Sequence, residues 1–441
     1  MGLLNTIIYF IITIVILVFV HEFGHFIAAK LSKMRVDKFY LFFDFFNLRI
    51  FKWVKGDTEY GIGVFPLGGY VKVAGMIDES MDKEFLDHPP QPWEFRSKPV
   101  YQRMFVITAG VIMNTLLAFI IFYTIALVQG KTRMETTTIG YISQNSIAEK
   151  FGLQKGDKII LINGHQVNFW DDIRTGIFIE GMGENIDIKA ERNGEIRDVY
   201  IPKSSFREMS EKAFGIYPPD MDPEILQVLP DKPAGRLGLE KGDKITELNG
   251  QKIYNSQQFV DLIKSNWDKD INLKWLREDK EISGTVHPDP DSTIGVGVGK
   301  YTGPIKTIHY NFLTAAPEGA KDLYNFGVVL FLKSMWKIIK GDIDFSKAIG
   351  GPIKIAQYAG QSAEGGLLSF LGFMAMLSIT LAIINILPFP ALDGGHFVFL
   401  LYEAIFKKPV SQKVQIVVQN IGFTILMLFM AYVVYNDIMH I

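Results

Sequence analysis

Residues 3–25 read LLNTIIYFIITIVILVFVHEFGH, an apolar run of membrane-spanning length that ends in the motif His-Glu-x-x-His. Residues 3–20 carry no charged side chain over 18 positions, close to the length that a helix needs to cross the hydrocarbon core of a bilayer. If the helix continues through the motif, His21 and His25 lie one turn apart on the same face. Ionisable groups at membrane depth are costly and mark function, so the motif predicts chemistry inside or at the edge of a membrane.

The motif is typical of zinc hydrolases, because imidazoles at positions i and i+4 can bind one tetrahedral zinc ion. Glu22, next to the first histidine, is placed to take a proton from water that the metal activates. A catalytic zinc needs a third protein ligand, and no acid or histidine follows His25 at a suitable spacing on the same helix. The chain has no cysteine, so the third ligand must be a His, Asp or Glu from elsewhere.

That ligand is expected from residues 385–396, which read NILPFPALDGGH and close a later apolar segment. Pro388 and Pro390 break a helix and free backbone groups, which membrane proteins tolerate where those groups line a site. Asp393 is the first candidate, because the two glycines that follow it permit close approach. His396 is the rival ligand, and an Asp in such a turn also serves as a turn residue or a helix cap.

Four segments are apolar enough to cross a membrane as helices: residues 1–31, 104–128, 367–388 and 416–436. Lys and Arg residues follow the first segment, precede the second, and lie between the third and the fourth. Because basic loops stay in the cytoplasm, residues 32–103 and 389–415 are predicted to be cytoplasmic. Both termini and the long region between the second and third segments are then predicted to lie outside.

The first cytoplasmic loop contains a candidate β-hairpin at residues 60–76. It begins YGIGVFPLGGYVKVAG, in which apolar residues alternate with small ones. With Gly68 and Gly69 as the turn, this pattern predicts two short paired strands. Its apolar content would let the hairpin enter the membrane if it packs against protein, and an ordinary soluble hairpin is the alternative.

The outer region contains an internal repeat. Residues 148–159, AEKFGLQKGDKI, return as residues 234–245, AGRLGLEKGDKI, and a following Asn-Gly pair recurs at the same offset of 86 residues. The pattern predicts two tandem α+β modules, at residues 135–216 and 222–297. The spacing resembles that of bacterial PDZ domains, which bind extended peptides or C-termini by adding a strand at a groove.

In the permuted form of the PDZ domain that membrane proteases carry, the loop that faces the peptide carboxylate comes late in the domain. Two stretches match this loop, Phe214-Gly215-Ile216 in the first module and Ile294-Gly295-Val296 in the second. The resemblance therefore implies peptides or C-termini as partners at these grooves. The alternative is that one or both grooves are closed and that the modules act as bulky spacers.

Residues 302–366 form a linker between the repeats and the third apolar segment. Within it, residues 320–340 place apolar side chains against lysines with helical spacing, which predicts an amphipathic helix. Such a helix either lies on the membrane surface or packs against the repeat modules.

The overall charge is nearly balanced, because 45 Lys and Arg residues against 47 Asp and Glu residues give a formal net charge of −2. No basic field points to a nucleic-acid partner. Hydrophobic residues make up 48% of the chain and are concentrated in a few segments. The expected environment is therefore a lipid bilayer.

HEFGH in a first span, LDGG near the end of a later one, and PDZ-like modules between them resemble the site-2 protease family of intramembrane zinc metalloproteases. The resemblance covers essentially the whole chain. It implies that His21, His25 and Asp393 bind one Zn²⁺ ion and that Glu22 is the catalytic base. His396 is then expected to be structural or to lie behind the ligands.

The resemblance also assigns residues to substrate binding. Asn385, in the signature N-x-x-P-x-x-x-LDG, is implied to hold the substrate strand. Asn114 ends a G-x-x-x-N pattern on the second span, and it is expected either to hydrogen-bond the substrate backbone or to join two helices. The segment that contains Gly68, Gly69 and Tyr70 is implied to present the substrate as an extended strand.

Together these features predict a multi-pass α-helical membrane protein with four transmembrane helices, a membrane-associated β-hairpin and two tandem extracytoplasmic PDZ domains. The resemblance implies a zinc endopeptidase of the bacterial inner membrane, with both termini and the PDZ domains in the periplasm. Its expected substrates are the transmembrane segments of single-span proteins after a first trimming cut, such as an anti-sigma factor or remnant signal peptides. The alternative is a membrane-tethered PDZ scaffold with an inactive zinc site.

Overall fold

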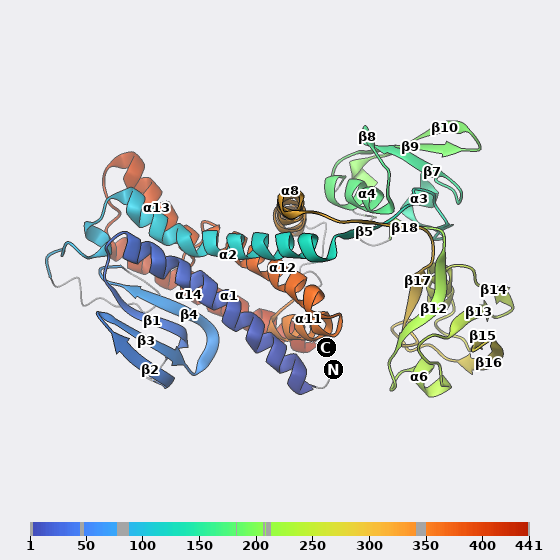
Figure 1. The fold of residues 1–441 in the computed structure, drawn as a ribbon, viewed down its shortest axis with the longest axis horizontal. Coiled ribbons are helices and arrows are strands. Elements are labelled where there is room, and N and C mark those ends of the chain that lie inside the picture. Colours follow the sequence, from blue (N-terminus) through green and yellow to red (C-terminus); the bar gives the residue numbers. More distant parts are fainter. Residues whose placement is uncertain are drawn as a thin grey trace. The chain divides into compact units, whose positions relative to one another are not determined.

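The computed structural model describes residues 3–44, 48–76, 88–181, 183–205, 208, 213–340 and 350–439. The chain divides into two compact units (Figure 1). The first unit combines Met1–Gly130 with His309–Ile441, and the second is the intervening Lys131–Ile308. The two units are described separately below.

The first unit is mainly helical. Its helical elements are α1 (Leu3–Leu31), η3 (Phe95–Ser97), α2 (Val100–Gln129), α8 (Phe312–Asp322), the π-helical η6 (Leu323–Val329), α9 (Leu330–Lys340), α11 (Pro352–Glu364), α12 (Leu367–Ile386), α13 (Asp393–Phe406) and α14 (Gln412–Met439). Four of them, α1, α2, α12 and α14, are long and apolar enough to cross a membrane, which confirms the four predicted spans. α2 is the central helix, because it packs against both α1 and α12 (Figure 1).

Two helical segments of the first unit extend what the sequence predicts. The segment after the third span, predicted as a loop, contains the 14-residue helix α13. The predicted amphipathic helix belongs to a longer helical run, α8–η6–α9, whose elements α8 and η6 pack against the helix bundle. Gly319 of α8 lies against the backbone of Tyr123 on α2, and Gly327 of η6 lies against Ile379 on α12.

A four-stranded sheet completes the first unit, with strands β1 (Val36–Phe43), β2 (Arg49–Lys55), β3 (Thr58–Gly63) and β4 (Phe65–Val73) in the order β2-β3-β1-β4. The predicted hairpin at residues 60–76 is wrong in its pairing, because β1 lies between β3 and β4 and pairs with both. Gly68 and Gly69 are not a turn but lie within β4. The intervening strand β1 is the stretch VDKFYLFF, which lies outside the segment expected to form the hairpin.

The sheet is fixed to α1 by aromatic side chains. Phe39 of β1 lies edge-on to Phe19 and Phe26 of α1, with ring centroids 6.0 and 5.4 Å apart. Tyr60 of β3 also meets Phe26, at 5.9 Å. Such edge-to-face pairs add to the apolar burial, so the sheet is held at the level of the metal motif rather than at the end of the helix.

The second unit contains the two repeats. The first has β5 (Lys131–Met134), β6 (Tyr141–Ile142), α3 (Ile147–Lys150), β7 (Lys158–Ile162), β8 (His165–Gln166), α4 (Trp170–Arg174), the π-helical η4 (Thr175–Glu180), β9 (Ile186–Arg192), β10 (Glu195–Ile201), η5 (Lys203–Ser205) and β11 (Ile216–Tyr217). The second has β12 (Met221–Val228), α6 (Pro233–Leu237), β13 (Lys244–Leu248), β14 (Gln251–Lys252), α7 (Ser256–Ser265), β15 (Ile271–Arg277), β16 (Lys280–Val286) and β17 (Val296–Tyr301). β18 (Ile305–Ile308) pairs with β5, so the segments that enter and leave the unit are joined.

Each repeat has its own apolar core and the same buried ion pair. Asp157 is fully buried, and the Arg192 guanidinium donates to both of its carboxylate oxygens at 2.6 and 2.8 Å. In the second repeat, Arg277 holds the buried Asp243 in the same way, with both distances 2.7 Å. Both aspartates belong to the repeated Gly-Asp motif, so the motif supplies the buried carboxylate of an ion pair within each repeat.

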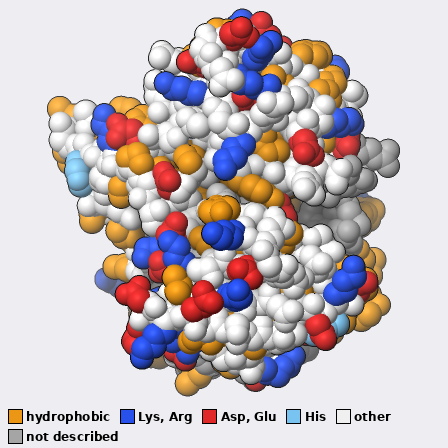
Figure 2. Space-filling view, turned by 90° about the vertical axis from the view of Figure 1, so that its right-hand side faces the viewer, with side chains coloured by type: hydrophobic (Ala, Val, Ile, Leu, Met, Phe, Trp, Pro, Cys, Tyr) orange, Lys and Arg blue, Asp and Glu red, His pale blue; other side chains and the backbone are white. Residues whose placement is uncertain are grey.

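The surface of the second unit carries charges of both signs. Cross-strand ion pairs such as Lys244–Asp222 and Lys300–Glu224 are spread along its strands. Figure 2 views the molecule from the right-hand side of Figure 1, and Lys and Arg side chains are interspersed there with Asp and Glu. This face therefore offers no extended surface of one charge for a polyanion.

The repeated ion pair gives a testable prediction about stability. Arg192→Met leaves the buried Asp157 carboxylate without its counter-charge, which should destabilise the first repeat. Arg277→Met does the same in the second repeat. Hydrogen-exchange mass spectrometry on the full-length protein should show faster exchange confined to the repeat that carries the substitution. Unchanged exchange in both variants would contradict a stabilising role for the pair.

Candidate metal centre

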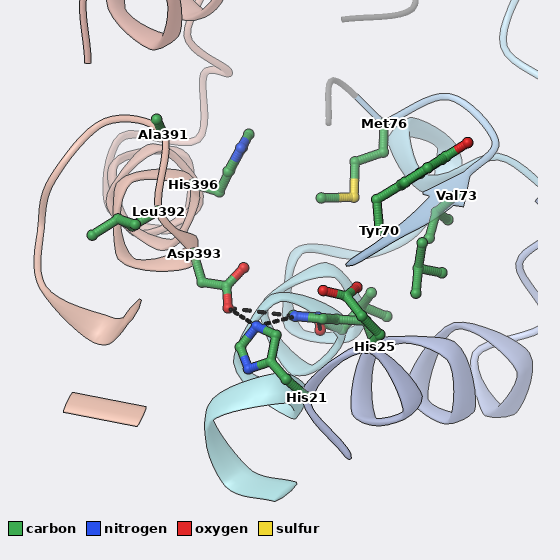
Figure 3. Close-up of a pocket in the computed structure, with 12 residues that line it drawn as sticks. His21, His25, Tyr70, Val73, Met76, Ala391, Leu392, Asp393 and His396 are labelled. Atoms are coloured by element: carbon green, nitrogen blue, oxygen red, sulfur yellow. Dashed lines mark hydrogen bonds and ion pairs between the residues drawn. The ribbon is translucent and has the colours of Figure 1, made fainter. Parts of the chain in front are cut away.

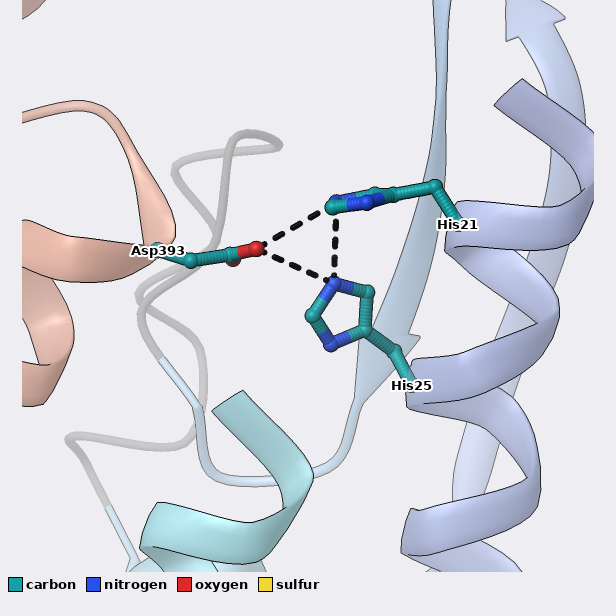
Figure 4. Close-up of side chains that lie close together, drawn as sticks. All are labelled: His21, His25 and Asp393. Atoms are coloured by element: carbon teal, nitrogen blue, oxygen red, sulfur yellow. Dashed lines mark hydrogen bonds and ion pairs between the residues drawn. The ribbon is translucent and has the colours of Figure 1, made fainter. Parts of the chain in front are cut away.

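His21 and His25 lie on the same face of α1, as the motif predicted. Their Nε2 atoms are 3.2 Å apart, and both rings face the start of α13 (Figure 4). His21 lies ten residues before Leu31, the end of α1, which corresponds to about 15 Å along the helix axis. If α1 spans a bilayer, the two rings lie well inside its thickness of about 30 Å.

The tautomer of His25 follows from its hydrogen bond. Its Nδ1 lies 2.8 Å from the backbone carbonyl oxygen of Val106 on α2. A carbonyl can only accept, so Nδ1 carries a proton, and in the neutral ring Nε2 then keeps its lone pair. That lone pair is therefore free to bind a metal ion.

Asp393 supplies the third ligand atom. It is the first residue of α13, where the helix dipole favours a carboxylate. Its Oδ2 lies 3.2 Å from His21 Nε2 and 3.4 Å from His25 Nε2 (Figure 4). This oxygen is buried without a hydrogen-bond partner among the described residues, as expected of an atom that binds a metal.

The three atoms fit a zinc ion. Bonds of about 2.0–2.1 Å to a tetrahedral zinc place its ligand atoms about 3.3–3.4 Å apart, and the observed separations are 3.2, 3.2 and 3.4 Å. Two imidazoles and one carboxylate also form a typical catalytic set that leaves one position open. Within the described part of the chain, this is the only group of three His, Cys, Asp or Glu side chains close enough to hold a metal.

Glycines allow the helices to approach closely at this point. A Cβ at Gly24 would overlap the backbone of Ala109 on α2, and a Cβ at Gly110 would overlap the rings of both His21 and His25. Gly394, after the aspartate, is pressed against the backbone at the end of α12. The first part of the G-x-x-x-N pattern therefore makes room for the imidazoles.

Glu22 lines the same pocket as the three ligands. The pocket is lined by His21, Glu22, His25, Tyr70, Val71, Val73, Met76, Val106, Ala391, Leu392, Asp393 and His396. Gly69 of β4 passes so close to α1 that a Cβ there would meet Val18 and Glu22. The Glu22 side chain thus lies in contact distance of β4 and borders the pocket that the three ligands share.

Strand β4 forms one wall of the pocket and one edge of the sheet. Tyr70 lines the pocket from β4, and its hydroxyl donates to Asp44 at 2.8 Å. Its ring stacks on Tyr40 with centroids 5.5 Å apart, and Tyr40 in turn donates to Glu59. Burial and this hydrogen bond raise the pKa of Tyr40 to about 12, so that its hydroxyl stays protonated and holds the stack in place.

The two predicted asparagines both lie beside His21, on opposite sides of its ring. Asn385, in the last turn of α12, places its amide nitrogen 3.4 Å from Nε2, the nitrogen that faces Asp393. Asn114 on α2 is fully buried and places its amide nitrogen 3.4 Å from Nδ1, on the far side. Asn385 therefore borders the metal-binding side, whereas Asn114 lies behind the ligand.

His396, the rival ligand, lines the pocket but lies outside the group of three (Figure 3). Gln419 of α14 holds it. The backbone N–H of Ala391 donates to Gln419 Oε1 at 2.5 Å, so the Gln419 amide nitrogen is the atom that lies 3.1 Å from His396 Nε2. His396 therefore accepts at Nε2, is neutral, and carries its proton on Nδ1.

Gln419 was not singled out from the sequence, because α14 reads as an ordinary apolar span. The signal that was available is a polar residue within that span, since polar groups at membrane depth need partners. Gln419 also holds the loop before α13, in which Ala391 has a φ of +73°. This left-handed backbone is uncommon for a residue with a side chain, and the hydrogen bond helps to keep it in place.

The predicted groove residues of the repeats occupy two kinds of position. Phe214 and Ile294 are each 2% exposed and belong to the apolar cores, so their side chains are not open to a ligand. Ile216 begins β11, and Val296 begins β17, the edge strand of the second sheet. An added peptide strand would therefore meet backbone groups at these positions.

Comparison with known proteins identifies a family for this chain. The profile of peptidase family M50 matches residues 9–429. The regulator of sigma-E protease RseP of Escherichia coli (strain K12) is 31% identical over 448 residues, which cover 97% of each chain. Protease RseP of Yersinia pestis is 32% identical over 461 residues, which cover 99% of each chain.

Solved structures match a smaller part of the chain. The PDZ domain of an SdrC-like protein from Listeria innocua is 30% identical and covers 18% of this chain and 92% of that domain, with a TM-score of 0.16. The corresponding domain from Listeria monocytogenes is 27% identical and covers 19% and 90%, also with a TM-score of 0.16.

The ligand geometry predicts different outcomes for Asp393 and its rival. Asp393→Ala removes one of three ligands, and it should weaken zinc binding by more than the about 10–100-fold that loss of an outer partner costs. His396→Ala removes a ring held by Gln419, and it should bind zinc like the wild type. Zinc titration against a chelating dye measures both variants. Loss of zinc in His396→Ala with retention in Asp393→Ala would reverse the assignment.

Proposed function

The chain belongs to peptidase family M50 and is an intramembrane zinc metalloprotease, and on this premise we propose that His21, His25 and Asp393 hold its zinc ion. The observation that carries the proposal is the ligand triangle, with three atoms 3.2–3.4 Å apart on two helices. The neighbouring Glu22 carboxylate is the proposed catalytic base. A peptidase needs such a base beside the metal, and Glu22 lines the pocket that the ligands share.

The chemistry divides between the metal and the protein. Zinc held at this site would lower the pKa of water and polarise the scissile carbonyl. Glu22 accepts a proton from the attacking water and passes it to the nitrogen of the leaving amine. The C–O bond to the carbonyl carbon forms first, and the C–N bond of the peptide breaks once the leaving nitrogen has received the proton. The reaction therefore consumes one water and needs no other reactant.

Substrate binding is assigned to β4 and Asn385. A helical substrate hides its amide bonds, so it must unwind locally before it can be cut. Its freed N–H and C=O groups would be costly in lipid unless they find partners. β4 is the edge strand next to Glu22, and the backbone at Gly68, Gly69 and Tyr70 is placed to pair with such a strand. The Asn385 amide, beside the ligand triangle, would hold the backbone near the scissile bond.

The proposed substrates are transmembrane segments of single-span proteins that have already lost their outer domain. The two relatives described above are both named RseP, and the Escherichia coli protein is called a regulator of sigma-E protease. An anti-sigma factor in envelope-stress signalling is therefore one candidate substrate, and remnant signal peptides are another. The chain would lie in the bacterial inner membrane, because four apolar helices cross it and basic residues flank them on one side.

The two repeats are proposed to be tandem PDZ domains on the periplasmic side, with both termini on that side as well. They would bind peptides or C-termini along β11 and β17, or exclude proteins whose outer domain is still intact. Deleting residues 135–297 separates these roles, because only the loss of a size filter would let an untrimmed substrate be cut. A membrane-tethered scaffold with an inactive site is less well supported, since peptide binding makes no use of Glu22 beside a metal site.

The proposal predicts the behaviour of Glu22→Gln. This variant should keep zinc, because Glu22 is not a ligand, but it should lose at least about 100-fold in activity because general base catalysis contributes about 10²–10⁴-fold. The measurement is cleavage of a pre-trimmed single-span reporter by purified wild type and variant, with zinc content as the control. Equal cleavage by both would refute the role of Glu22, and failure of the wild type on several such reporters would refute the substrate class.

A further inference from the structure

The side-chain amide of Asn114 has one polar neighbour among the described residues, the His21 ring. Among the described residues its only polar contact is with His21 Nδ1, at 3.4 Å. The Oδ1 atom of the same amide is buried and has no hydrogen-bond partner. An unpaired buried amide oxygen is costly, and at membrane depth no water can replace the missing partner.

A histidine that binds a metal through Nε2 needs an acceptor at Nδ1. The neutral ring has one proton, and when Nε2 gives its lone pair to the metal that proton sits on Nδ1. His25 meets this requirement through the carbonyl oxygen of Val106, at 2.8 Å. For His21 the group in the corresponding place is the Asn114 amide.

Rotating the Asn114 amide by 180° about its last bond exchanges Oδ1 and Nδ2 and moves no other atom. Oxygen and nitrogen of an amide are assigned from the hydrogen bonds that they make. After the rotation, the unpaired oxygen faces the Nδ1 proton of His21. The rotation supplies the missing acceptor for His21 and a partner for Oδ1, and the amide nitrogen then takes the buried position in which Oδ1 had no partner among the described residues.

We propose that Asn114 is a positioning residue whose Oδ1 accepts the Nδ1 proton of His21 and thereby holds Nε2 toward the zinc ion. The inference rests on the proposed assignment of His21 as a zinc ligand. It departs from the expectation that Asn114 binds substrate, because Asn114 is fully buried and lies behind the ring, away from Asp393. Outer partners of this kind fix the orientation of a ligand and raise its basicity.

The rest of α2 is consistent with this role. Gly110 is one turn before Asn114 on the same face, and only the absence of a side chain there leaves room for the two imidazoles. Ser378 of α12 donates to the backbone carbonyl of Asn114 at 2.8 Å. The contact between α2 and α12 at this point therefore uses the backbone of Asn114, and the side-chain amide is left for the histidine.

The test compares three variants of the full-length protein in detergent. Asn114→Leu keeps the size but removes the acceptor, and zinc affinity should fall about 10–100-fold. Asn114→Asp keeps an acceptor, and its zinc affinity should equal or exceed that of the wild type. Ser378→Ala removes the neighbouring helix contact without touching the amide, and it should bind zinc normally. Thermal unfolding in the presence of a chelator checks that all three are folded.

A purely structural role predicts the opposite order. If Asn114 only packs two helices together, the buried charge of Asn114→Asp is more damaging than the apolar Asn114→Leu, and Ser378→Ala also weakens the site. Wild-type zinc affinity in Asn114→Leu, together with loss of zinc in Asp393→Ala, would overturn this proposal alone. Wild-type affinity in Asp393→Ala would overturn the ligand assignment and this proposal with it.

A measurement on the wild type avoids any loss of folding. Nitrogen-15 histidine NMR of the zinc-loaded protein distinguishes the ring nitrogen that carries a proton from the one that binds metal. The proposal requires a protonated Nδ1 and a metal-bound Nε2 for His21. A metal-bound Nδ1 would contradict it.

Discussion

The arrangement depends on one constraint, that polar groups at membrane depth must be paired. Two histidines on α1 bring four ring nitrogens into a region where water is scarce, and each nitrogen needs a partner. Their Nε2 atoms converge with Asp393, and the described neighbours of the two Nδ1 atoms are Val106 and Asn114 of α2. The helix pair α1–α2 and the start of α13 are therefore positioned by the same hydrogen-bonding requirement that creates the site.

Close approach of backbones is the second condition, and glycine meets it. Gly24 and Gly110 let α1 and α2 come together where the rings lie, and Gly69 lets β4 pass next to Glu22. Any side chain at these positions would displace an element that carries a ligand or the base. The elements that form the site therefore meet at glycines. Their polar side chains surround one pocket.

The parts of this arrangement that are local in sequence could be predicted. An apolar run of 18 residues, the i and i+4 histidines, the Asp-Gly-Gly turn and the 86-residue repeat are each visible within a short window. The sheet could not be predicted in the same way, because β1 enters between β3 and β4, and strand order depends on contacts distant in sequence. The composition of the Gly68-Gly69 pair favours a turn, whereas in the structure the pair lies within β4 and Gly69 allows this strand to approach α1.

The partners of two polar residues in the apolar helices could not be predicted either. Only the neighbours of Gln419 and Asn114 in the structure show what their side chains hold. The general rule that such residues need a partner was available, but the identity of the partner was not. The two asparagines lie beside different nitrogens of the His21 ring. Asn385 lies beside Nε2 and borders the reaction, whereas Asn114 lies beside Nδ1 and positions the ligand.

The central claim is that peptide bonds are cut at the depth of the motif on α1, about 15 Å from the end of that helix. The most direct measurement is the position of the cut bond in a single-span substrate, found by mass spectrometry of both products after reaction in lipid vesicles. The account predicts a cut within the apolar segment of the substrate. A cut confined to the polar flank, outside the hydrocarbon, would contradict it.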